Sequence, residues 1–508
     1  MPDVLALQAA AQPEKPALIE GGRVVSYALL NERANRAAYA FHDLGITRGE
    51  RVATMAFNST AGFEVTAGLR KVEGVGVPVN FRLRGEELAY VLNDSGARVV
   101  CAGPDFVEHV HAVRKRLSGK PALVALGADV PPGWLAYEDL LQRASAENPA
   151  ASESEAMGAS MIYTSGTTGR PKGAFRPNGV APEFVLQSVQ LFGLQSDDVH
   201  LMAGPGYHSA VGFFCALTLA TGATIVIMPR FDAEEALRLI DRHRVTTTFM
   251  APTLLGRMMD LPQEVRDRYD VSSMRALILG AAPCPFALKE RAVPYFGECI
   301  YEFYGATETG VNLILRPEEQ LKKPGSVGRV SPGQEIRLLD DQGNPVPEGQ
   351  PGELWVRNGW LASYHGRPDA TERSMRDGFF SVGDVAYRDG DGFYYLCDRK
   401  IDMVISGGVN IYPAEVEACL FAHPAVRDVA VIGVPDDQWG ESVKAIVALQ
   451  PGAAATEAEL IDWCRGRIAD YKRPRSVDFV ENLPRDQAGK LLKRQIREPY
   501  WAGTGRRI

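Results

Sequence analysis

The sequence predicts an α/β fold, with a large N-terminal domain of layered sheets and several subdomains and a small C-terminal α/β domain. The chain has 508 residues, more than one hydrophobic core usually covers, so two or more domains are expected. Helical and strand patterns alternate along its first part, and after about residue 325 short strands separated by Gly, Asp and Asn turns follow. The alternation indicates parallel sheets covered by helices, and the later change indicates a mainly β subdomain.

The elements of the first part are predicted from the spacing of their apolar residues. Residues 27–44 have apolar side chains at helical spacing, and residues 51–55 follow as a strand. Further along, a helix is expected over 233–243, and strands are expected over 245–250 and 274–279. This alternation is the basis of the α/β prediction.

The last part of the chain has a different organisation. Turns at 340–344 and 388–392, rich in Gly, Asp and Asn, separate the short strands of the β subdomain. From residue 402 a compact α/β unit is expected, with a helix over 413–421 and a strand over 428–433.

Composition argues against several classes of protein. The net charge of −8 and the pI near 5.7 disfavour a nucleic acid or an anionic membrane as the main partner. The seven cysteines are scattered and include no Cys-x-x-Cys pair, which fits neither a disulfide framework nor a zinc site. The N-terminus lacks the basic region and apolar core of a signal peptide. The sequence therefore predicts a cytoplasmic location.

One uncharged stretch, residues 205–228, is long enough to require a test against a membrane span. It carries His208 and Ser209 near its start and a turn-like segment at 221–224. A buried helix, a turn and a buried strand explain this pattern better, so no membrane span is predicted.

The most informative segment is a loop that follows an apolar strand, with the sequence MIYTSGTTGRPKG at residues 161–173. Its glycines let backbone N–H groups approach phosphate oxygens, its hydroxyls add donors, and its lysine supplies positive charge. It is not a Walker loop, because Pro171 stands where that pattern requires glycine. A polar surface loop is the alternative, but this combination of residues after a strand favours a phosphate site.

This loop resembles the signature loop of the adenylate-forming superfamily, which includes acyl-CoA synthetases, 4-coumarate-CoA-ligase-like enzymes, luciferases and the adenylation domains of peptide synthetases. The likeness continues in order along nearly all of the chain. By this resemblance the loop binds ATP and AMP, and its first threonine also contacts the metal ion. The residues that match are Thr164, Ser165, Gly166, Thr167, Thr168, Gly169 and Lys172.

A second segment, YEFYGATETG at residues 301–310, matches the family's second signature. An aromatic ring can stack on adenine, a hydroxyl can reach the α-phosphate, and a carboxylate can hold Mg²⁺. The resemblance assigns these roles to Tyr304, Thr307 and Glu308, and it places Thr307 among the catalytic residues. Mg²⁺ is expected because ATP's polyphosphate repels the incoming carboxylate.

Three shorter matches complete the expected nucleotide site. Gly280, Ala281 and Ala282 follow a strand and resemble the family's adenine-side loop, where small residues let a flat base lie against the backbone. Asp384 and Arg399 resemble the pair that contacts the ribose. A carboxylate is a simple chemical match for two neighbouring hydroxyl groups.

The acid-binding pocket is expected around His208, which matches a family position beside that pocket, and the resemblance places His208 among the catalytic residues. A histidine with a purely structural role is the alternative, and both interpretations remain open. The apolar residues that follow indicate a roomy apolar pocket, which favours a hydrophobic aliphatic, aromatic or alicyclic acid over acetate or malonate. The expected lining is Tyr207, His208, Ser209, Gly305 and Ala306.

Two motifs of the small domain resemble functional loops of the family. Gly407 and Gly408 match the loop that lines the tunnel for the pantetheine arm of coenzyme A, because adjacent glycines let a thin chain come close to the backbone. Lys490 matches a mobile catalytic lysine that binds ATP, orients the carboxylate and stabilises charge in the transition state. Between the domains the family usually has Asp or Lys where this chain has Ile401, which leaves the hinge mechanism open.

The resemblance implies an AMP-binding N-terminal domain over 1–397, a C-terminal domain over 402–508 and a hinge at 398–402. It implies an enzyme of fatty-acid or other lipid metabolism, an AMP-forming acid–thiol ligase. Such a ligase makes acyl-AMP from ATP and a hydrophobic acid, with Mg²⁺, and then a thioester with coenzyme A, while the small domain rotates between the two steps. Two alternatives stay open: transfer to a carrier protein or an amine, and a non-enzymatic nucleotide-binding module. A homodimer is compatible with the sequence.

Overall fold

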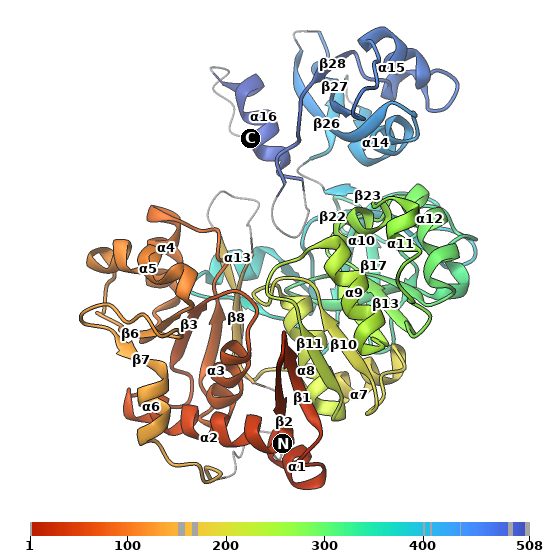
Figure 1. The fold of residues 1–508 in the computed structure, drawn as a ribbon. Coiled ribbons are helices and arrows are strands. Elements are labelled where there is room, and N and C mark those ends of the chain that lie inside the picture. Colours follow the sequence, from red (N-terminus) through yellow and green to blue (C-terminus); the bar gives the residue numbers. More distant parts are fainter. Residues whose placement is uncertain are drawn as a thin grey trace.

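The structure, a computed structural model, describes residues 3–150, 158–164, 171–399, 402–406, 409–436, 438–485 and 491–502, with the backbone alone for Asp398, Arg399 and Asn410. The described residues form four sheets with helices packed around them (Figure 1). The first two sheets lie side by side in the lower part of Figure 1, and the C-terminal sheet lies above them. This arrangement confirms the predicted fold class, a large N-terminal domain of several sheets with a small C-terminal α/β domain.

The first sheet is largely parallel and ends in the hairpin that carries the phosphate-loop motif. Its antiparallel edge pairs Thr164 with Lys172, at the two sides of the motif. In spatial order its strands are β19 (Ser363–Tyr364), β9 (Lys172–Arg176), β8 (Ser160–Thr164), β4 (Val75–Pro78), β3 (Arg51–Met55), β5 (Val99–Ala102), β6 (Ala122–Ala125) and β7 (Leu135–Ala136). The helices of this block are α2 (Tyr27–Asp43), α3 (Thr60–Lys71), α4 (Gly85–Ser95), α5 (Val107–Val113) and α6 (Tyr137–Arg143).

The second sheet has a parallel centre that is buried on both faces. Leu277 and Leu279 of one central strand join the core on one face, whereas Ala276 and Ile278 join the core on the other, as the two-residue period of a strand requires. In spatial order the strands are β16 (Arg329–Val330), β15 (Gly310–Leu315), β14 (Ile300–Ala306), β13 (Ala276–Leu279), β12 (Thr247–Met250), β10 (Val199–Met202), β11 (Thr224–Ile227), β1 (Pro16–Glu20) and β2 (Arg23–Ser26).

Helices cover both faces of this second sheet. Those that pack on it include α9 (Ala233–His243), α10 (Pro252–Met259) and α12 (Phe286–Phe296) on one face and α8 (Ser209–Thr221) on the other. Nearby are α1 (Val4–Ala11), α7 (Pro182–Leu191) and the short α11 (Gln263–Arg266).

The local sequence explains where these elements begin and end. Asp232 caps α9 by accepting the Glu235 N–H at 2.9 Å. After the helix the Val245 N–H donates to the Ile240 carbonyl at 3.0 Å, so the following strand begins two residues later than predicted, at Thr247. Similarly, Met274 closes a turn onto Val271, which delays the start of β13.

The uncharged stretch folds as the sequence analysis predicted, into helix α8, a turn and strand β11. Gly222 ends the helix with φ at +80°, a left-handed conformation that favours glycine. Within the described part of the chain, no helix combines the length and the apolar character that crossing a membrane requires.

The third and fourth sheets are small. The third is antiparallel and contains β20 (Met375–Arg376), β21 (Phe379–Phe380), β18 (Gly352–Arg357), β22 (Asp384–Arg388) and β23 (Tyr394–Arg399), with β17 (Glu335–Leu339) on β18 and helix α13 (Pro368–Arg373) beside it. The fourth contains β25 (Val409–Ile411), β24 (Val404–Ser406), β27 (Gly440–Leu449), β26 (Val426–Asp436) and β28 (Ser476–Phe479), with helices α14 (Pro413–Phe421), α15 (Glu457–Trp463) and α16 (Lys493–Trp501). Strand β26 is longer than predicted, because it pairs with β27 along almost its whole length.

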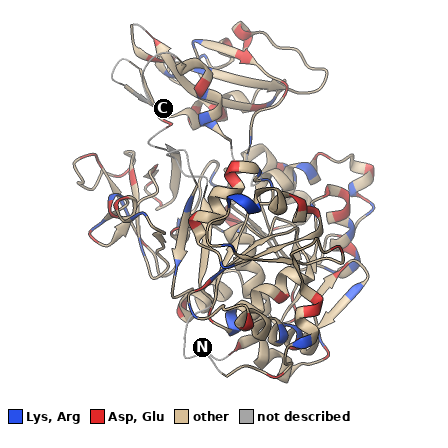
Figure 2. Ribbon diagram, turned by 90° about the vertical axis from the view of Figure 1, so that its left-hand side faces the viewer, with Lys and Arg blue, Asp and Glu red and all other residues tan. Residues whose placement is uncertain are grey.

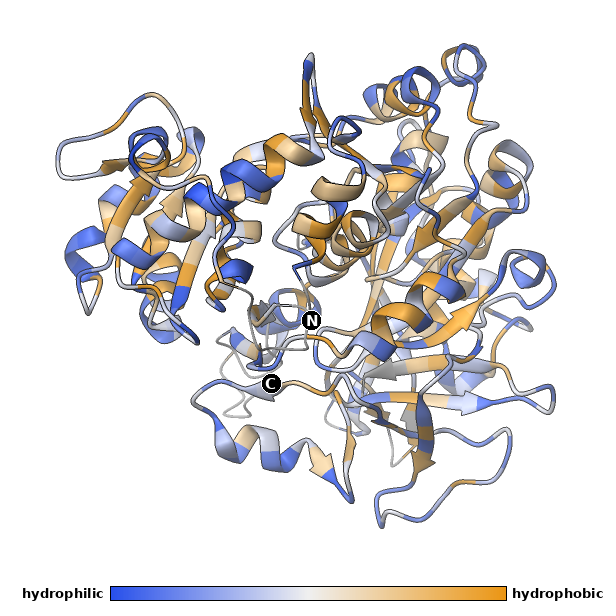
Figure 3. Cartoon of the chain, turned by 90° about the horizontal axis from the view of Figure 1, so that it is seen from below, coloured by the Kyte–Doolittle hydropathy of each residue, from blue (hydrophilic) through white to orange (hydrophobic). Residues whose placement is uncertain are grey.

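Polar and apolar residues separate as expected for packed layers. Lys, Arg, Asp and Glu residues lie largely on helices and loops at the outside of the molecule (Figure 2), and many strands carry strongly hydrophobic residues (Figure 3). All seven cysteines are free thiols. The core therefore consists of apolar layers on both faces of β13, the strand that leads into the predicted adenine-side loop.

Candidate active site

The end of strand β14 brings together two residues that the sequence analysis assigned to the nucleotide. The Tyr304 hydroxyl donates to Oδ2 of Asp384 at 2.5 Å. Tyr304 belongs to the second sheet and Asp384 begins β22 of the third, so the contact joins two sheets. An aromatic face beside a carboxylate suits a base with its attached ribose.

The adenine-side loop lies next to this pair. It follows β13, whose Leu279 pairs with Glu302 of β14. A Cβ atom on Gly280 would lie 2.8 Å from the Phe303 ring, so this position requires glycine. Ala281 has φ at +70°, a left-handed conformation that is uncommon for a residue other than glycine. Ala281 and Ala282 are half-buried.

Thr307, which the sequence analysis assigned to the α-phosphate, contacts a residue of the predicted acid pocket. Its Oγ1 lies 3.1 Å from Oγ of Ser209, the first residue of helix α8. His208 caps that helix, and its Nδ1 accepts the Ala210 N–H at 3.3 Å. The His208 ring also stacks on Phe249 with ring centroids 6.4 Å apart. His208 thus has a structural role through one ring nitrogen, and it lies beside the hydroxyl pair.

Glu308, the predicted metal ligand, is buried beside the predicted phosphate residues. Its exposed fraction is 6%, and its Oε1 accepts the Tyr364 hydroxyl at 2.9 Å. The Lys172 ammonium lies over the same Tyr364 ring, 4.9 Å from its centroid. Burial lowers the pKa of Lys172, while the neighbouring Glu308 charge raises it. The Glu308 carboxylate and the Lys172 ammonium thus both contact the side chain of Tyr364.

Hydrogen bonds from helix α4 hold the residues that flank the phosphate loop on both sides. The Tyr163 hydroxyl donates to Asp94 at 2.8 Å, and the Tyr90 hydroxyl donates to the Pro171 carbonyl at 3.1 Å. Burial, together with the Asp94 bond, raises the pKa of Tyr163 well above its usual range. Thr164 ends β8 opposite Lys172. The predicted phosphate-binding residues between them, Ser165, Gly166, Thr167, Thr168 and Gly169, lie outside the described residues.

Several predicted residues of the hinge and the small domain also lie outside the described part. These are Ile401, Gly407, Gly408 and Lys490. The hairpin of β24 and β25 flanks the two glycines, and a bridge between Arg485 and Leu491 flanks the lysine segment. The Arg399 backbone pairs with Asp384 in the sheet register.

Sequence reasoning missed Arg176, a cation inside the candidate site. Arg176 is 4% exposed. Its Nε donates to the Trp360 carbonyl at 3.0 Å, its Nη2 donates to the Thr307 carbonyl, and its guanidinium lies 4.3 Å from the Trp360 ring. Burial lowers the pKa of Arg176 to about 10. The available signal was an arginine three residues after the phosphate-loop motif, but its partners lie more than a hundred residues away in the sequence.

Comparisons with known proteins show which family the chain resembles. Residues 5–364 match the family model of the AMP-binding enzymes, and residues 415–490 match that of the AMP-binding enzyme C-terminal domain. A feruloyl-CoA synthase from an Amycolatopsis species is 37% identical over 497 residues, covering 97% of each chain. A fatty acid–[acyl-carrier-protein] ligase from Streptomyces coeruleorubidus is 30% identical, covering 98% of this chain and 96% of that protein.

A solved structure is also similar over nearly the whole chain. It is an anthranilate CoA ligase in complex with anthranoyl-AMP, with a TM-score of 0.89, 28% identity and coverage of 99% of this chain and 98% of that one. The chain therefore belongs to the AMP-binding enzyme family, the adenylate-forming superfamily that includes the acyl-CoA synthetases.

Proposed function

We propose that this enzyme activates a hydrophobic carboxylic acid with ATP to an acyl-adenylate and then forms a thioester with coenzyme A. The observation that carries this proposal is the contact between Ser209 and Thr307, 3.1 Å apart. It joins the start of the helix beside the predicted acid pocket to the motif expected at the α-phosphate. A reaction between a carboxylate and the α-phosphorus needs these two sites to meet.

The nucleotide half of the site follows from the side chains around Tyr304. The tyrosine ring stacks on adenine, with Gly280, Ala281 and Ala282 on the other side of the base. Asp384, held by the Tyr304 hydroxyl at 2.5 Å, accepts from the ribose hydroxyls together with Arg399. The phosphate loop Thr164–Gly169 and Lys172 hold the β- and γ-phosphates.

We propose Mg²⁺ as the bound metal ion, held by Glu308 with Thr164 nearby. The residues fit: Glu308 is a buried carboxylate with one oxygen bonded to Tyr364, and hard cations prefer oxygen ligands. Within the described part of the chain, no three His, Cys, Asp or Glu residues cluster as a complete metal site; with Glu308 and Thr164 as protein ligands, phosphate oxygens and water would supply the other ligands. When bound, the ion neutralises charge on the polyphosphate.

In the first step a carboxylate oxygen of the acid attacks the α-phosphorus, and the bond to the β-phosphate oxygen breaks, releasing pyrophosphate. Ser209 and Thr307 position the two reactants, and His208 lies beside them. Lys490 orients the carboxylate and balances charge that develops on the α-phosphate. We expect an apolar acid in a pocket formed by Tyr207, Gly305 and Ala306 beside His208, because the His208 ring stacks on Phe249, which in turn stacks on Phe214.

In the second step the sulfur of coenzyme A attacks the carbonyl carbon of the adenylate, AMP leaves, and the thiol proton is released. Gly407 and Gly408 line the path of the pantetheine arm. We place the domain boundary at a hinge over 398–402, between an N-terminal domain at 1–397 and a C-terminal domain at 402–508. The change of sheet between β23 and β24 supports this boundary. Rotation at the hinge would present the second loop after adenylation.

A carrier-protein thiol is the second candidate acceptor. The 30% identical fatty acid–[acyl-carrier-protein] ligase supports it. A thiol on a carrier-protein pantetheine and the thiol of coenzyme A are chemically alike, so the glycine pair suits both. Comparing coenzyme A, a loaded carrier protein and an amine with the same adenylate distinguishes these acceptors.

Pyrophosphate release tests the proposal across a panel of acetate, malonate, aliphatic, aromatic and alicyclic acids, with and without coenzyme A. We expect release with one or more hydrophobic acids, weak release with acetate and malonate, and faster turnover when coenzyme A is present. Release with none of the acids would contradict an adenylating activity. Release that no thiol accelerates would point to an amine acceptor.

A further inference from the structure

One face of helix α4 is bonded to both flanks of the phosphate loop. Oδ2 of Asp94 accepts the hydroxyl of Tyr163, near the end of strand β8, at 2.8 Å. One helical turn earlier, the Tyr90 hydroxyl donates to the carbonyl of Pro171, just before β9, at 3.1 Å. Residues four apart lie on the same face of a helix. A single helix face therefore holds a point on each side of the loop.

Arg367, in the segment before helix α13, joins these two contacts into one network. Its Nη2 donates to Oδ1 of Asp94 at 2.9 Å and to the Tyr90 hydroxyl at 3.2 Å. Asp94 thus uses both carboxylate oxygens. The side chain of Arg367 is 44% exposed, and an ion pair with so exposed a partner contributes little to stability. Its effect is to orient the two side chains of α4 that hold the loop.

Helix α4 is firmly packed beneath these contacts. Leu88, Val91 and Leu92 of the helix are buried in the core of the first sheet, and the rings of Tyr90 and Tyr163 pack against the same core. Close-packed interiors deform little. The helix can therefore serve as a fixed reference for the residues bonded to it.

The Tyr90 contact reaches beyond what the sheet itself fixes. Strand pairing holds Thr164 opposite Lys172 and goes no further toward the loop. Pro171 is the first described residue after the loop, and as a proline it has no N–H to offer a neighbouring strand. Its carbonyl is bonded to Tyr90 instead. The hydroxyl thus fixes a residue that backbone pairing does not reach.

We propose that Asp94 and Tyr90 are positioning residues that hold the two ends of the phosphate loop at the separation that the β- and γ-phosphates of ATP require. The proposal rests on the proposed function, because it takes this loop as the polyphosphate site. Asp94 acts through Tyr163, and Tyr90 acts through Pro171. AMP has no β- or γ-phosphate, so the network should matter for ATP and not for AMP.

Three variants remove the network one bond at a time. Tyr90→Phe leaves the Pro171 carbonyl without the hydroxyl, and Tyr163→Phe removes the hydroxyl that Asp94 accepts. Asp94→Leu removes the acceptor itself at similar size. Combining Asp94→Leu with Tyr163→Phe tests whether the two residues act through their shared bond, because changes that break one interaction are not additive.

Two tyrosines on the second sheet supply matched controls. The Tyr295 hydroxyl donates to the Arg266 carbonyl at 3.0 Å, as Tyr90 does to a carbonyl, and the Tyr269 hydroxyl donates to Oε1 of Glu234 at 2.9 Å, as Tyr163 does to a carboxylate. Both rings pack against the core on one face of that sheet. Tyr295→Phe and Tyr269→Phe therefore remove the same kinds of bond without touching the phosphate loop.

The measurements are the affinities for ATP and for AMP by titration calorimetry without acid, together with the melting temperature. We expect Asp94→Leu, Tyr90→Phe and Tyr163→Phe each to bind ATP about three- to tenfold more weakly, the effect of losing one hydrogen bond. Their affinity for AMP should stay within about twofold of wild type. Adding Tyr163→Phe to Asp94→Leu should weaken ATP binding by no more than about twofold further. Both control variants should bind ATP as the wild type does.

A general loss of structure would weaken ATP and AMP binding alike, and equal losses for the two nucleotides would overturn the proposal. Wild-type ATP affinity in Tyr90→Phe and Tyr163→Phe would also overturn it, as would equal losses in the two control variants. If Asp94→Leu does not fold, these two variants decide, since each loses only a hydroxyl. Failure of the proposed function is a different result, in which the wild-type protein binds neither ATP nor AMP.

Discussion

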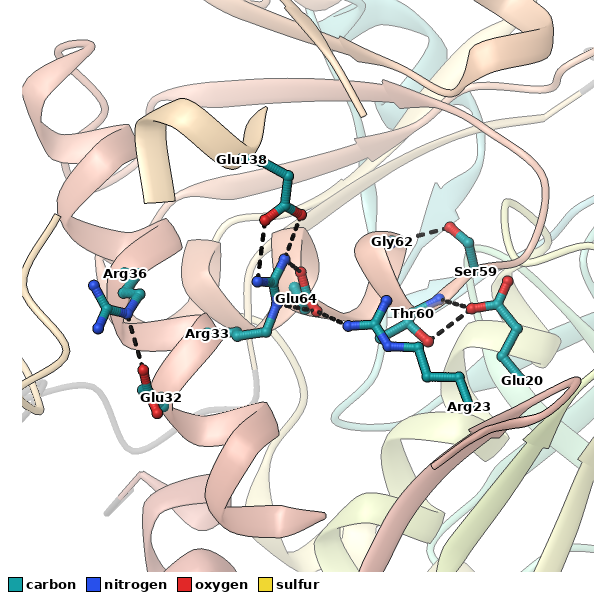
Figure 4. Close-up of polar contacts among 10 residues, drawn as sticks. All are labelled: Glu20, Arg23, Glu32, Arg33, Arg36, Ser59, Thr60, Gly62, Glu64 and Glu138. Carbon is teal, nitrogen blue, oxygen red and sulfur yellow. Dashed lines mark hydrogen bonds and ion pairs between the residues drawn. The ribbon is translucent and has the colours of Figure 1, made fainter. Parts of the chain in front are cut away.

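Glu64 and Glu302 are alike as carboxylates but sit in different settings. Both are buried, with exposed fractions of 0% and 4%, and burial raises the pKa of both. Glu64 receives two bonds from Arg33, at 2.5 and 2.8 Å, and Arg33 also bonds Glu138 (Figure 4). Glu302 instead pairs with the Lys289 ammonium. A buried carboxylate thus joins two helices in one region, and in the other it lies in the strand that carries Tyr304 of the candidate nucleotide site.

The comparison shows that burial and charge pairing do not by themselves indicate function. What distinguishes Glu302 is its neighbourhood: a loop with a left-handed Ala281 on one side and Tyr304 two residues further along the strand. Around Glu64 are the packed helices α2 and α3, with no predicted ligand contact nearby.

The largest expected effect is on stability when one partner of each pair is neutralised. Glu302→Gln leaves the Lys289 ammonium buried without a counter-ion, and breaking such a pair costs about 3–5 kcal/mol. Glu64→Gln should cost less, about 1–3 kcal/mol, because Arg33 keeps Glu138. Urea unfolding of both variants gives the two values. If Glu64→Gln lowered the free energy of unfolding as much as Glu302→Gln or more, the pairing of Arg33 with Glu138 would not be what limits the cost.

The next effect concerns Glu308, six residues beyond Glu302 in the same motif. Glu308→Gln removes a charged oxygen ligand, and we expect turnover to fall about tenfold to a thousandfold, with a higher Mg²⁺ requirement. The measurement is turnover as a function of Mg²⁺ concentration at saturating ATP. Glu64→Gln serves as the control and should keep the wild-type Mg²⁺ dependence. An unchanged Mg²⁺ dependence in Glu308→Gln would rule it out as the ligand.

The contrast between these carboxylates also shows what the sequence could predict. Strand ends, the phosphate loop and the Tyr304 motif depend on local patterns, and the elements at 27–43, 233–243 and 413–421 were predicted within a residue. The Lys289–Glu302 pair and Arg176 depend on partners brought together by sheet order. No spacing in the sequence encodes those contacts, since Arg176 meets Thr307 across 131 positions.

Strand boundaries were predicted less well, for a related reason. The strand predicted from Val245 begins at Thr247, because Val245 instead closes the end of helix α9. Strand β26 continues to Asp436 because β27 offers it a partner that far. An apolar run alone does not show where its neighbour in the sheet begins and ends.

His200 is a third buried titratable group, and among the described residues it forms no ion pair with a carboxylate. It therefore shows the effect of burial on a titratable group without an ion-pair partner. Burial lowers its pKa from 6.5 to about 4, and its Nδ1 lies 3.0 Å from Oγ1 of Thr247. At pH values between these two pKa values, His200 binds a proton in the unfolded chain but not in the folded one. The free energy of unfolding therefore falls as the pH decreases. We expect His200 to account for a decrease of about 1 kcal/mol in the free energy of unfolding when the pH falls from 7.5 to 5.5.

Urea unfolding at the two pH values, for wild type and His200→Gln, isolates this contribution. The variant should lose less stability on acidification than the wild type. The same loss in both proteins would mean that His200 is not held neutral by burial.

The smallest expected effect is at a surface pair on the same helix as Arg33. Arg36 donates to Glu32 at 3.0 Å, one helical turn apart, and both side chains contact solvent (Figure 4). Glu32→Gln should cost only about 0.3–0.5 kcal/mol, and added salt should reduce the difference further. A loss comparable to that of Glu64→Gln would show that burial is not what separates the two pairs.

The central claim, activation of an acid through an acyl-adenylate, is tested most directly by an isotope experiment. The best acid from the pyrophosphate screen is labelled with ¹⁸O in both carboxyl oxygens and converted with ATP and coenzyme A. Because a carboxylate oxygen attacks the α-phosphorus and the thiol then attacks the carbonyl carbon, we expect AMP to carry one labelled oxygen. Mass spectrometry that finds unlabelled AMP, with the label in pyrophosphate or phosphate, would contradict the account.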